Sequence, residues 1–171
     1  SDDIYQSVQP EKSSEVKINK SLKLGTFKKF VVVTANDYAT KIGYDILKKG
    51  GTVADAAVAI QLTLGLVEPQ SSGLGGGVFL TYYDKKTNKT ISFDGREKAP
   101  KNLKENIFLN KDGNPKRFFE AVVGGSSVGT PSTLKTLYSF HKSYGSLAWS
   151  EVIKPVIKFS SNGFFPPDRL I

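Results

Sequence analysis

Three charged residues near the middle of the chain are the first candidates for binding chemistry. Asp94, Arg96 and Glu97 belong to the tetrapeptide Asp-Gly-Arg-Glu, whose first residue, Asp94, ends a short strand-like stretch. An arginine where the chain leaves a strand can face a ligand, and its guanidinium can hold a carboxylate through two parallel hydrogen bonds. Position alone favours the alternative, in which Arg96 pairs with Asp94 or Glu97 on the surface. Both interpretations stay open at this point.

Composition argues against several other kinds of site. The chain has no cysteine and one histidine, so neither thiol chemistry nor a zinc site of the usual kind is expected. That histidine, His141, recurs at helical spacing with Leu134 and Leu137, which predicts a packing residue rather than a base. The net charge of +8 comes from 24 Lys and Arg against 16 Asp and Glu. Because the basic residues are mostly lysines spread along the chain, nucleic-acid binding is not expected.

A buried helix is the element expected to support this region. Residues 53–67 are almost entirely apolar, which is typical of a helix covered on all sides. Asp55, one turn inside, makes the stretch a poor membrane span. Thr52 offers an N-cap oxygen, and Asp55 falls in the first turn, where the helix dipole favours a negative charge. We therefore expect a core helix of a layered globular protein.

A run of glycines at 73–77 follows that helix and leads into a predicted strand. Phosphate-binding glycine loops have the opposite order, with the strand before the helix. Val78 also stands where the third glycine of a GxGxxG motif would be. We therefore expect the glycines to allow close backbone packing between helix and sheet, not to bind phosphate.

The remaining pattern predicts a domain of class α+β. At 171 residues the chain is long enough to bury a substantial core. The first expected elements are a strand at 30–35, a helix capped by Asn36 or Asp37 and ending at Gly50, the core helix, and a hairpin of strands 78–84 and 90–94. A loop at 98–114 and a strand at 121–128, interrupted by Gly124-Gly125, come next.

Two helical segments are expected to follow. The first is capped by Thr130, has Pro131 first and Gly145 as its stop, and turns Leu134, Leu137, Tyr138 and His141 inward. The second starts at Ser150, is broken or restarted at Pro155, closes at Asn162-Gly163, and turns Val152, Ile153, Val156 and Ile157 inward.

Several separated motifs resemble the large-subunit signature of the γ-glutamyltransferase family, also called γ-glutamyltranspeptidase or glutathione hydrolase. They are KGGTVADAAVAIQLTLGLVEPQSSGLGGG, DGREKAP, Gly129-Thr130-Pro131, Tyr144-Gly145 and the stretches 153–157 and 162–164, over roughly residues 30–165. The resemblance implies part of the four-layer αββα sandwich of the N-terminal nucleophile hydrolases. On this basis we expect a polar leader or arm at 1–29 and the N-terminal part of the large-subunit domain at 30–171.

The resemblance also implies an activity and its partners. Family members cleave γ-glutamyl amides such as glutathione and transfer the γ-glutamyl group to water, an amino acid or a peptide through a γ-glutamyl-threonine intermediate. The threonine heads a small subunit cut from the same precursor, so no catalytic residue is placed in this chain. Arg96 matches the arginine that binds the α-carboxylate of the γ-glutamyl group, with Asp94 and Glu97 as helpers. No cofactor, metal or transmembrane segment is expected, and the implied location is periplasmic or secreted.

Alternatives to this activity remain within and outside the family. Within it, the chain could belong to a poly-γ-glutamate depolymerase or transpeptidase, or to a β-lactam acylase. A non-catalytic relative that only binds γ-glutamyl compounds is a second class, and a basic nucleic-acid module is a third. Many members have His-Pro where this chain has Asn36-Asp37, and GVPGT where it has the stretch 127–131. These departures bear on pocket shape more than on fold.

Overall fold

The computed structural model describes residues 27–166 and residue 170, so most of the expected leader, residues 1–26, lies outside the described part. The chain divides into two compact units, one made of residues up to Ser72 and from Tyr144 onward, the other of Gly73–Ser143. Helices are combined with one two-stranded sheet, which confirms the α+β class. None of the helices in the described part is both long and apolar enough to cross a membrane.

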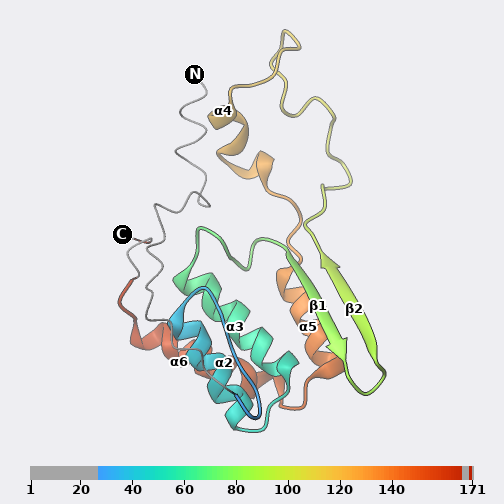
Figure 1. The fold of residues 1–171 in the computed structure, drawn as a ribbon. Helices are drawn as coiled ribbons and strands as arrows, with labels where there is room; N and C mark the ends of the chain where they lie inside the picture. The colour runs from blue at the N-terminus through green and yellow to red at the C-terminus, as the bar shows by residue number, and fades with distance from the viewer. Residues whose placement is uncertain (1–26, 167–169, 171) are drawn as a thin grey trace, which may run out of the picture. The chain divides into compact units, whose positions relative to one another are not determined.

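Three helices form the first unit. They are α2 (Asp37–Lys48), α3 (Val53–Val67) and α6 (Trp149–Asn162), and α3 packs against both of the others (Figure 1). The core helix and its bounds are as predicted. All three helices contribute fully or almost fully buried apolar side chains, among them Ala39, Ile46, Val58, Val67 and Val152.

Capping residues fix the starts of α2 and α3. Asn36 is the N-cap of α2, and its side-chain oxygen accepts a hydrogen bond from the Tyr38 N–H at 3.0 Å. Thr52 and Asp55 form a reciprocal capping box at the start of α3, in which Asp55 Oδ2 accepts from the Thr52 N–H at 2.7 Å. The predicted caps at both helices are therefore confirmed, with Asn36 rather than Asp37 at the first.

The strand predicted at 30–35 does not form. The segment runs extended with side chains alternating between half-buried and exposed, and the Phe30 ring packs against Tyr44 of α2 at a centroid distance of 5.3 Å. Val31 and Val33 are 55% and 86% exposed. A strand is defined by ladder hydrogen bonds to a neighbour, and the part of the chain that the structure describes supplies none to this segment. The β-branched residues alone do not specify strand pairing, because pairing depends on residues far away in sequence.

The last helix is not broken at Pro155, contrary to prediction. α6 is continuous and ends at Asn162, with Gly163 at φ +74° as its C-cap. Proline keeps a helical φ and removes only the bond to the carbonyl of Glu151, an exposed residue. Val152 and Val156, on either side of it, are both buried and hold the two halves of the helix in the core. Ile157 was also expected inside and is instead exposed.

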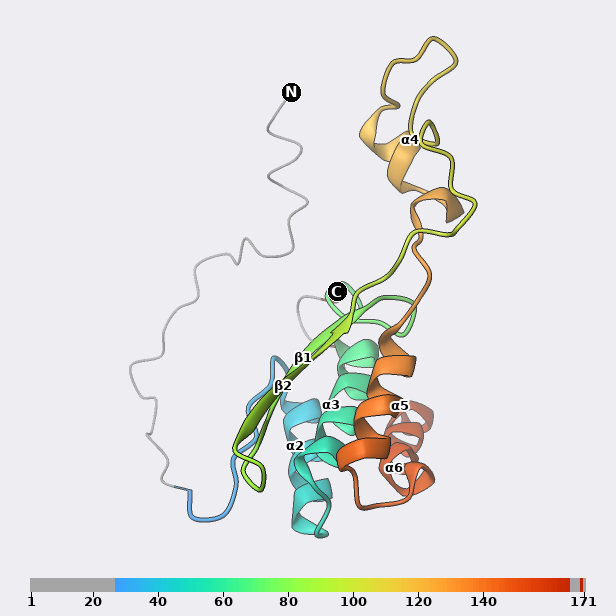
Figure 2. The same cartoon turned by 90° about the vertical axis from the view of Figure 1, so that its right-hand side faces the viewer.

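An antiparallel hairpin and one helix make up the ordered centre of the second unit. Strand β1 (Val78–Asp84) pairs with β2 (Lys89–Gly95) in a register that places Val78 opposite Gly95. Helix α5 (Thr133–Tyr144) lies along one face of the hairpin (Figure 2). The ring of Phe140 on α5 meets those of Tyr82 and Phe93 at centroid distances of 5.3 Å each. The hairpin prediction is confirmed, with the second strand one residue longer at each end.

Helix α5 begins later and faces a different way than predicted. Its first residue is Thr133 rather than Pro131, because the Thr130 N–H bonds to the Lys98 carbonyl at 2.8 Å and holds this stretch extended. Leu137 and His141 are buried as expected, but Leu134 and Tyr138 are exposed and Thr133 and Phe140 are buried in their place. Packing of Phe140 on the hairpin sets this rotation, which the spacing of apolar residues alone does not show.

The strand predicted at 121–128 is also wrong. This stretch holds the end of a short helix, α4 (Phe118–Val122), and a 3-10 turn, η1 (Gly125–Ser127). Gly124 between them has φ +104°, a conformation that interrupts an extended strand. The Ser127 hydroxyl donates to the Val122 carbonyl at 2.6 Å, so a local turn satisfies groups that a sheet would otherwise bond.

Candidate functional site

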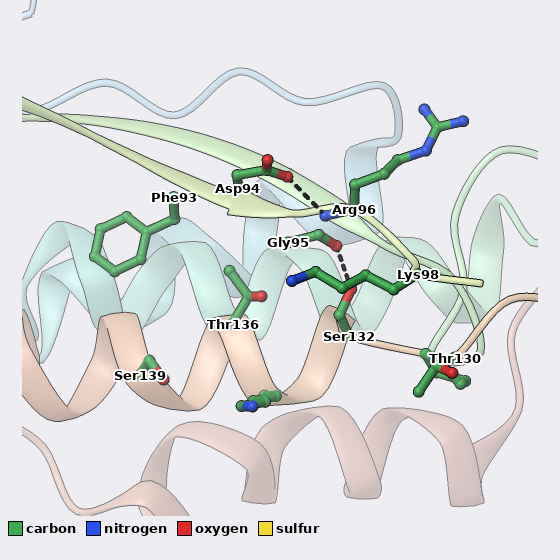
Figure 3. A pocket seen from close by; sticks show the side chains of 11 residues that line it. Phe93, Asp94, Gly95, Arg96, Lys98, Thr130, Ser132, Thr136 and Ser139 are labelled. Atoms are coloured by element: carbon green, nitrogen blue, oxygen red, sulfur yellow. Dashed lines mark hydrogen bonds between the residues drawn. The ribbon is translucent and has the colours of Figure 1, made fainter. Parts of the chain in front are cut away.

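Side chains at the end of β2 alternate between two faces of the hairpin. Phe93 contacts Phe140 of α5, and Gly95 is buried, so these two residues face the helix. Asp94 and Arg96, between and after them, are exposed and project from the opposite face, as the period of a strand requires (Figure 3). Phe93 and Gly95 therefore pack against α5, whereas Asp94 and Arg96 are available to face a ligand.

The backbones of β2, of the glycine run 73–77 and of the start of α5 lie close together. The Gly76 carbonyl accepts hydrogen bonds from the N–H groups of Ser132 at 3.1 Å and Thr133 at 3.2 Å, at the start of α5. The Ser132 hydroxyl donates to the Gly95 carbonyl. A Cβ at Gly95 would lie 2.7 Å from the Val78 carbonyl oxygen, and one at Gly77 would lie 2.6 Å from that of Gly95. The predicted close packing is confirmed at Gly76 and Gly77, whereas a Cβ at Gly73 or Gly75 would meet no atom within 4 Å.

Arg96 is held by its neighbours and exposed at its tip. Its backbone N–H donates to Asp94 Oδ1 at 3.0 Å, and its Nε lies 3.6 Å from Glu97 Oε2. The Arg96 side chain is 73% exposed and that of Glu97 is 32% exposed. Figure 3 shows the guanidinium pointing away from Ser132 and Thr136. The surface pairing with Glu97 considered from the sequence is thus present, and it leaves the two terminal nitrogens of the guanidinium directed outward.

A groove of about 390 Å³ lies between the end of β2 and α5. Three cationic side chains and one carboxylate line it, together with hydroxyl groups from the start of α5. The lining residues are Phe93, Asp94, Gly95, Arg96, Lys98, Thr130, Pro131, Ser132, Lys135, Thr136 and Ser139. Because cations outnumber carboxylates, the groove suits an anionic ligand better than a metal ion. Within the described residues, no three His, Asp or Glu side chains gather where they could hold a metal.

Two of these cations were missed from the sequence. Lys98 follows the Asp-Gly-Arg-Glu tetrapeptide by one residue, and in Figure 3 its side chain runs back along α5 toward Thr136. Lys135 lies on α5 next to Thr136 and four residues before Ser139. The only signal in the sequence was a polar stripe at positions 135, 136 and 139 of α5, with position 132 just before the helix, opposite its apolar face. Sequence reasoning tracked the apolar face alone.

Comparison with known proteins gives a consistent result. Residues 39–170 match the gamma-glutamyltranspeptidase family. The glutathione hydrolase proenzyme of Bacillus subtilis (strain 168) is 44% identical over 141 residues, which are 82% of this chain and 24% of that protein. The chain therefore spans about a quarter of the length of the curated relatives that it matches.

Solved structures show the same relationship. The gamma-glutamyltranspeptidase of Pseudomonas nitroreducens, solved in complex with L-DON, superposes with a TM-score of 0.79 at 35% identity, over 84% of this chain and 42% of that one. The transpeptidase enzyme CapD of Bacillus anthracis gives 0.64 at 28% identity, over 86% and 42%. Family match, relatives and fold agree with the resemblance found in the sequence: the chain belongs to the gamma-glutamyltranspeptidase family.

Proposed function

We propose that the protein containing this chain cleaves γ-glutamyl amides such as glutathione, and that Arg96 binds the α-carboxylate of the γ-glutamyl group. The observation that carries the proposal is the position of Arg96 at the end of β2, with its backbone fixed by Asp94 and its guanidinium exposed. The family match and the similarity to a glutathione hydrolase proenzyme support the substrate class.

The geometry around Arg96 suits recognition of a carboxylate. Glu97 lies close to Nε and leaves the two terminal nitrogens to form parallel hydrogen bonds with the two oxygens of a ligand. A charge-assisted pair of this kind contributes about 1.5–3 kcal/mol to binding. Asp94 bonds the backbone rather than the guanidinium and so orients the start of the side chain. Asp94 and Glu97 are proposed as positioning residues, not as ligands.

The proposed reaction follows the family scheme. A threonine hydroxyl from the small subunit of the same precursor attacks the γ-carbonyl carbon; the ester bond forms, the amide C–N bond breaks, and the amine leaves with the hydroxyl proton. Water or a second amine then attacks the ester, which releases glutamate or a new γ-glutamyl amide and restores the hydroxyl. In this scheme the described chain supplies donor recognition and support for the site, and the bond changes occur on residues outside it.

Substitution of Arg96 in the full-length protein tests the proposal. Arg96→Gln removes the charge and the fork of donors, so KM for a γ-glutamyl anilide should rise roughly 10- to 100-fold. Arg96→Lys keeps the charge and should recover part of the loss. Arg117→Gln is the matched control, because Arg117 is an exposed arginine paired with Glu120 and does not line the groove. An unchanged KM for Arg96→Gln would remove Arg96 from the site.

A transpeptidase acting on a γ-linked polymer is the second candidate. The similarity to the transpeptidase enzyme CapD is the observation that favours it. Incubation of the purified protein with glutathione, poly-γ-glutamate and an acylated β-lactam separates these activities by product. Release of cysteinylglycine supports the first proposal, whereas polymer shortening or acyl cleavage with glutathione intact supports a relative with another donor. Binding of γ-glutamyl compounds without turnover would indicate a non-catalytic relative.

A periplasmic or secreted location is part of the same proposal. Its support is the family membership of the chain. Cell fractionation with a cytoplasmic marker enzyme tests it, and recovery of the protein with that marker would contradict it.

A further inference from the structure

We infer that the groove between the end of β2 and α5 binds a second carboxylate of the donor through Lys98 and Lys135. The preferred donors would then be γ-glutamyl peptides that carry a free carboxylate on the leaving side, as glutathione does at its glycine. This inference rests on the proposed function, in which Arg96 takes the α-carboxylate of the γ-glutamyl group.

The charge of the groove is the first observation. Arg96, Lys98 and Lys135 line it against one carboxylate, that of Asp94. The ion pairs found among the described residues join Lys41 to Asp45, Arg96 to Glu97 and Arg117 to Glu120, so neither groove lysine belongs to one. Among the described residues neither ammonium group is paired with a carboxylate, although that of Asp94 lines the same groove. A groove lined mostly by one sign of charge focuses the electrostatic field and raises the local concentration of anions.

Hydroxyl groups add hydrogen-bond donors to the same surface. Thr136 and Ser139 lie three residues apart on α5, which places them on one face of the helix, and both line the groove. Lys135 and Ser139 are four residues apart and are neighbours in the same way. A carboxylate has about four lone-pair sites and can accept from an ammonium and a hydroxyl together.

A donor with two carboxylates has to reach from Arg96 to the groove. Figure 3 shows Lys98 running along α5 while Arg96 projects from the other side of the chain. Two residues of extended backbone separate their Cα atoms by about 7 Å, and both side chains are long and flexible. A tripeptide spans about 10 Å when extended. For one γ-glutamyl peptide to place its first carboxylate at Arg96 and its last one in the groove, the flexible side chains of Arg96 and Lys98 must turn toward one another.

Glutathione and its glycine amide form the matched pair of ligands for the test, since they differ only in the second carboxylate. Dissociation constants are measured by titration calorimetry with the full-length protein, and KM values are measured beside them. The wild-type protein should bind glutathione roughly tenfold more tightly than the amide. The double substitution Lys98→Gln with Lys135→Gln should bring the two dissociation constants within about twofold of each other.

Control variants separate the groove from general surface charge. Lys101→Gln with Lys104→Gln removes the same charge from lysines that do not line the groove, and it should preserve the wild-type preference. Lys98→Arg with Lys135→Arg keeps both charges and should also preserve it. Circular dichroism of each variant checks that the protein is folded.

Each outcome has one interpretation. The inference is supported if the preference for glutathione over its amide is lost in the glutamine double variant and retained in the control variants. Equal affinity of the wild-type protein for the two ligands overturns it, as does a preference that survives the glutamine double variant. Turnover of glutathione without a preference for it over the amide would support the proposed function and contradict the groove site. Binding of neither glutathione nor its amide would contradict both the proposed function and the groove site.

Discussion

The Asp55 carboxylate accepts a hydrogen bond from the backbone N–H of Ser146 at 3.1 Å, although 91 residues separate them in the sequence. It also accepts from the Ser146 hydroxyl at 3.1 Å and from the Thr52 N–H at 2.7 Å. The Asp55 side chain is fully buried. One carboxylate therefore caps α3 and fastens the segment before α6 to the same helix end.

Replacing Asp55 by asparagine should lower the free energy of unfolding by about 2–3 kcal/mol. The amide keeps one acceptor oxygen but places an NH₂ group among donors and removes the charge that strengthens each bond. Urea unfolding of the full-length protein measures the effect. Asp45→Asn is the control, because Asp45 pairs with Lys41 at the surface, and it should change the free energy by less than about 0.5 kcal/mol. Equal effects of the two substitutions would contradict a special role for Asp55.

The contribution of Asp55 should depend on pH in the acid range. Burial raises the pKa of its carboxyl, but hydrogen bonds from the backbone of Thr52 and Ser146, the Thr52 hydroxyl and the Leu147 backbone outweigh burial and bring the pKa below its ordinary value of 3.8. A lowered folded-state pKa means that the stabilisation is complete above the unfolded-state pKa and is lost as the pH falls through the folded-state value. The stability difference between wild type and Asp55→Asn should thus be constant from about pH 5 upward and shrink below about pH 4. A difference that grows on acidification would be inconsistent with this account.

Gly95→Ala should destabilise the second unit and weaken donor binding together. Its Cβ would lie 2.7 Å from the Val78 carbonyl oxygen on the paired strand, so backbone must move, at a cost of about 1–3 kcal/mol. Arg96 is the next residue and should be displaced with it, which predicts a higher KM for a γ-glutamyl anilide. Gly75→Ala is the control, because a Cβ there meets no atom within 4 Å. Thermal midpoints and KM values of both variants check the prediction, and parallel behaviour of the two would contradict it.

Pro155→Ala should stabilise the protein, provided that α6 is continuous as observed. Alanine restores an N–H donor for the Glu151 carbonyl and has a higher helix propensity. Removing proline also raises the conformational entropy of the unfolded chain, which offsets part of this gain. The free energy of unfolding should therefore increase by about 1–2 kcal/mol. An upward shift of the urea midpoint is the measurement. A downward shift would mean that the proline holds a bend that the helix requires.

The sequence predicted best the features that depend on neighbouring residues. The apolar run 53–67 predicted a buried helix, and Thr52 with Asp55 predicted its cap, because both signals are local. The family resemblance located Arg96, and strand alternation explains why it projects away from α5. Neither signal could reveal the groove, since its walls come from β2 and α5, and Gly95 and Ser132 are 37 residues apart.

The failed predictions share a physical cause. At 30–35 the residue types favour extended backbone, but pairing needs a partner strand that local sequence does not specify. At 121–128 the same residue types fold into turns, because Gly124 takes a positive φ and Ser127 bonds locally. On α5, the spacing of apolar residues allows either Leu134 or Phe140 to face inward. Phe140 faces inward because its ring packs against the hairpin.

At the end of β2, side chains that face outward alternate with residues that face α5. Donor selectivity can therefore be engineered at the outward positions without changing the residues that stabilise the fold. Because side chains 94 and 96 are exposed, replacements there should change donor preference and leave the thermal midpoint near that of the parent, whereas replacements at 93 and 95 should lower it. A library restricted to positions 94 and 96 would therefore yield a high fraction of folded clones.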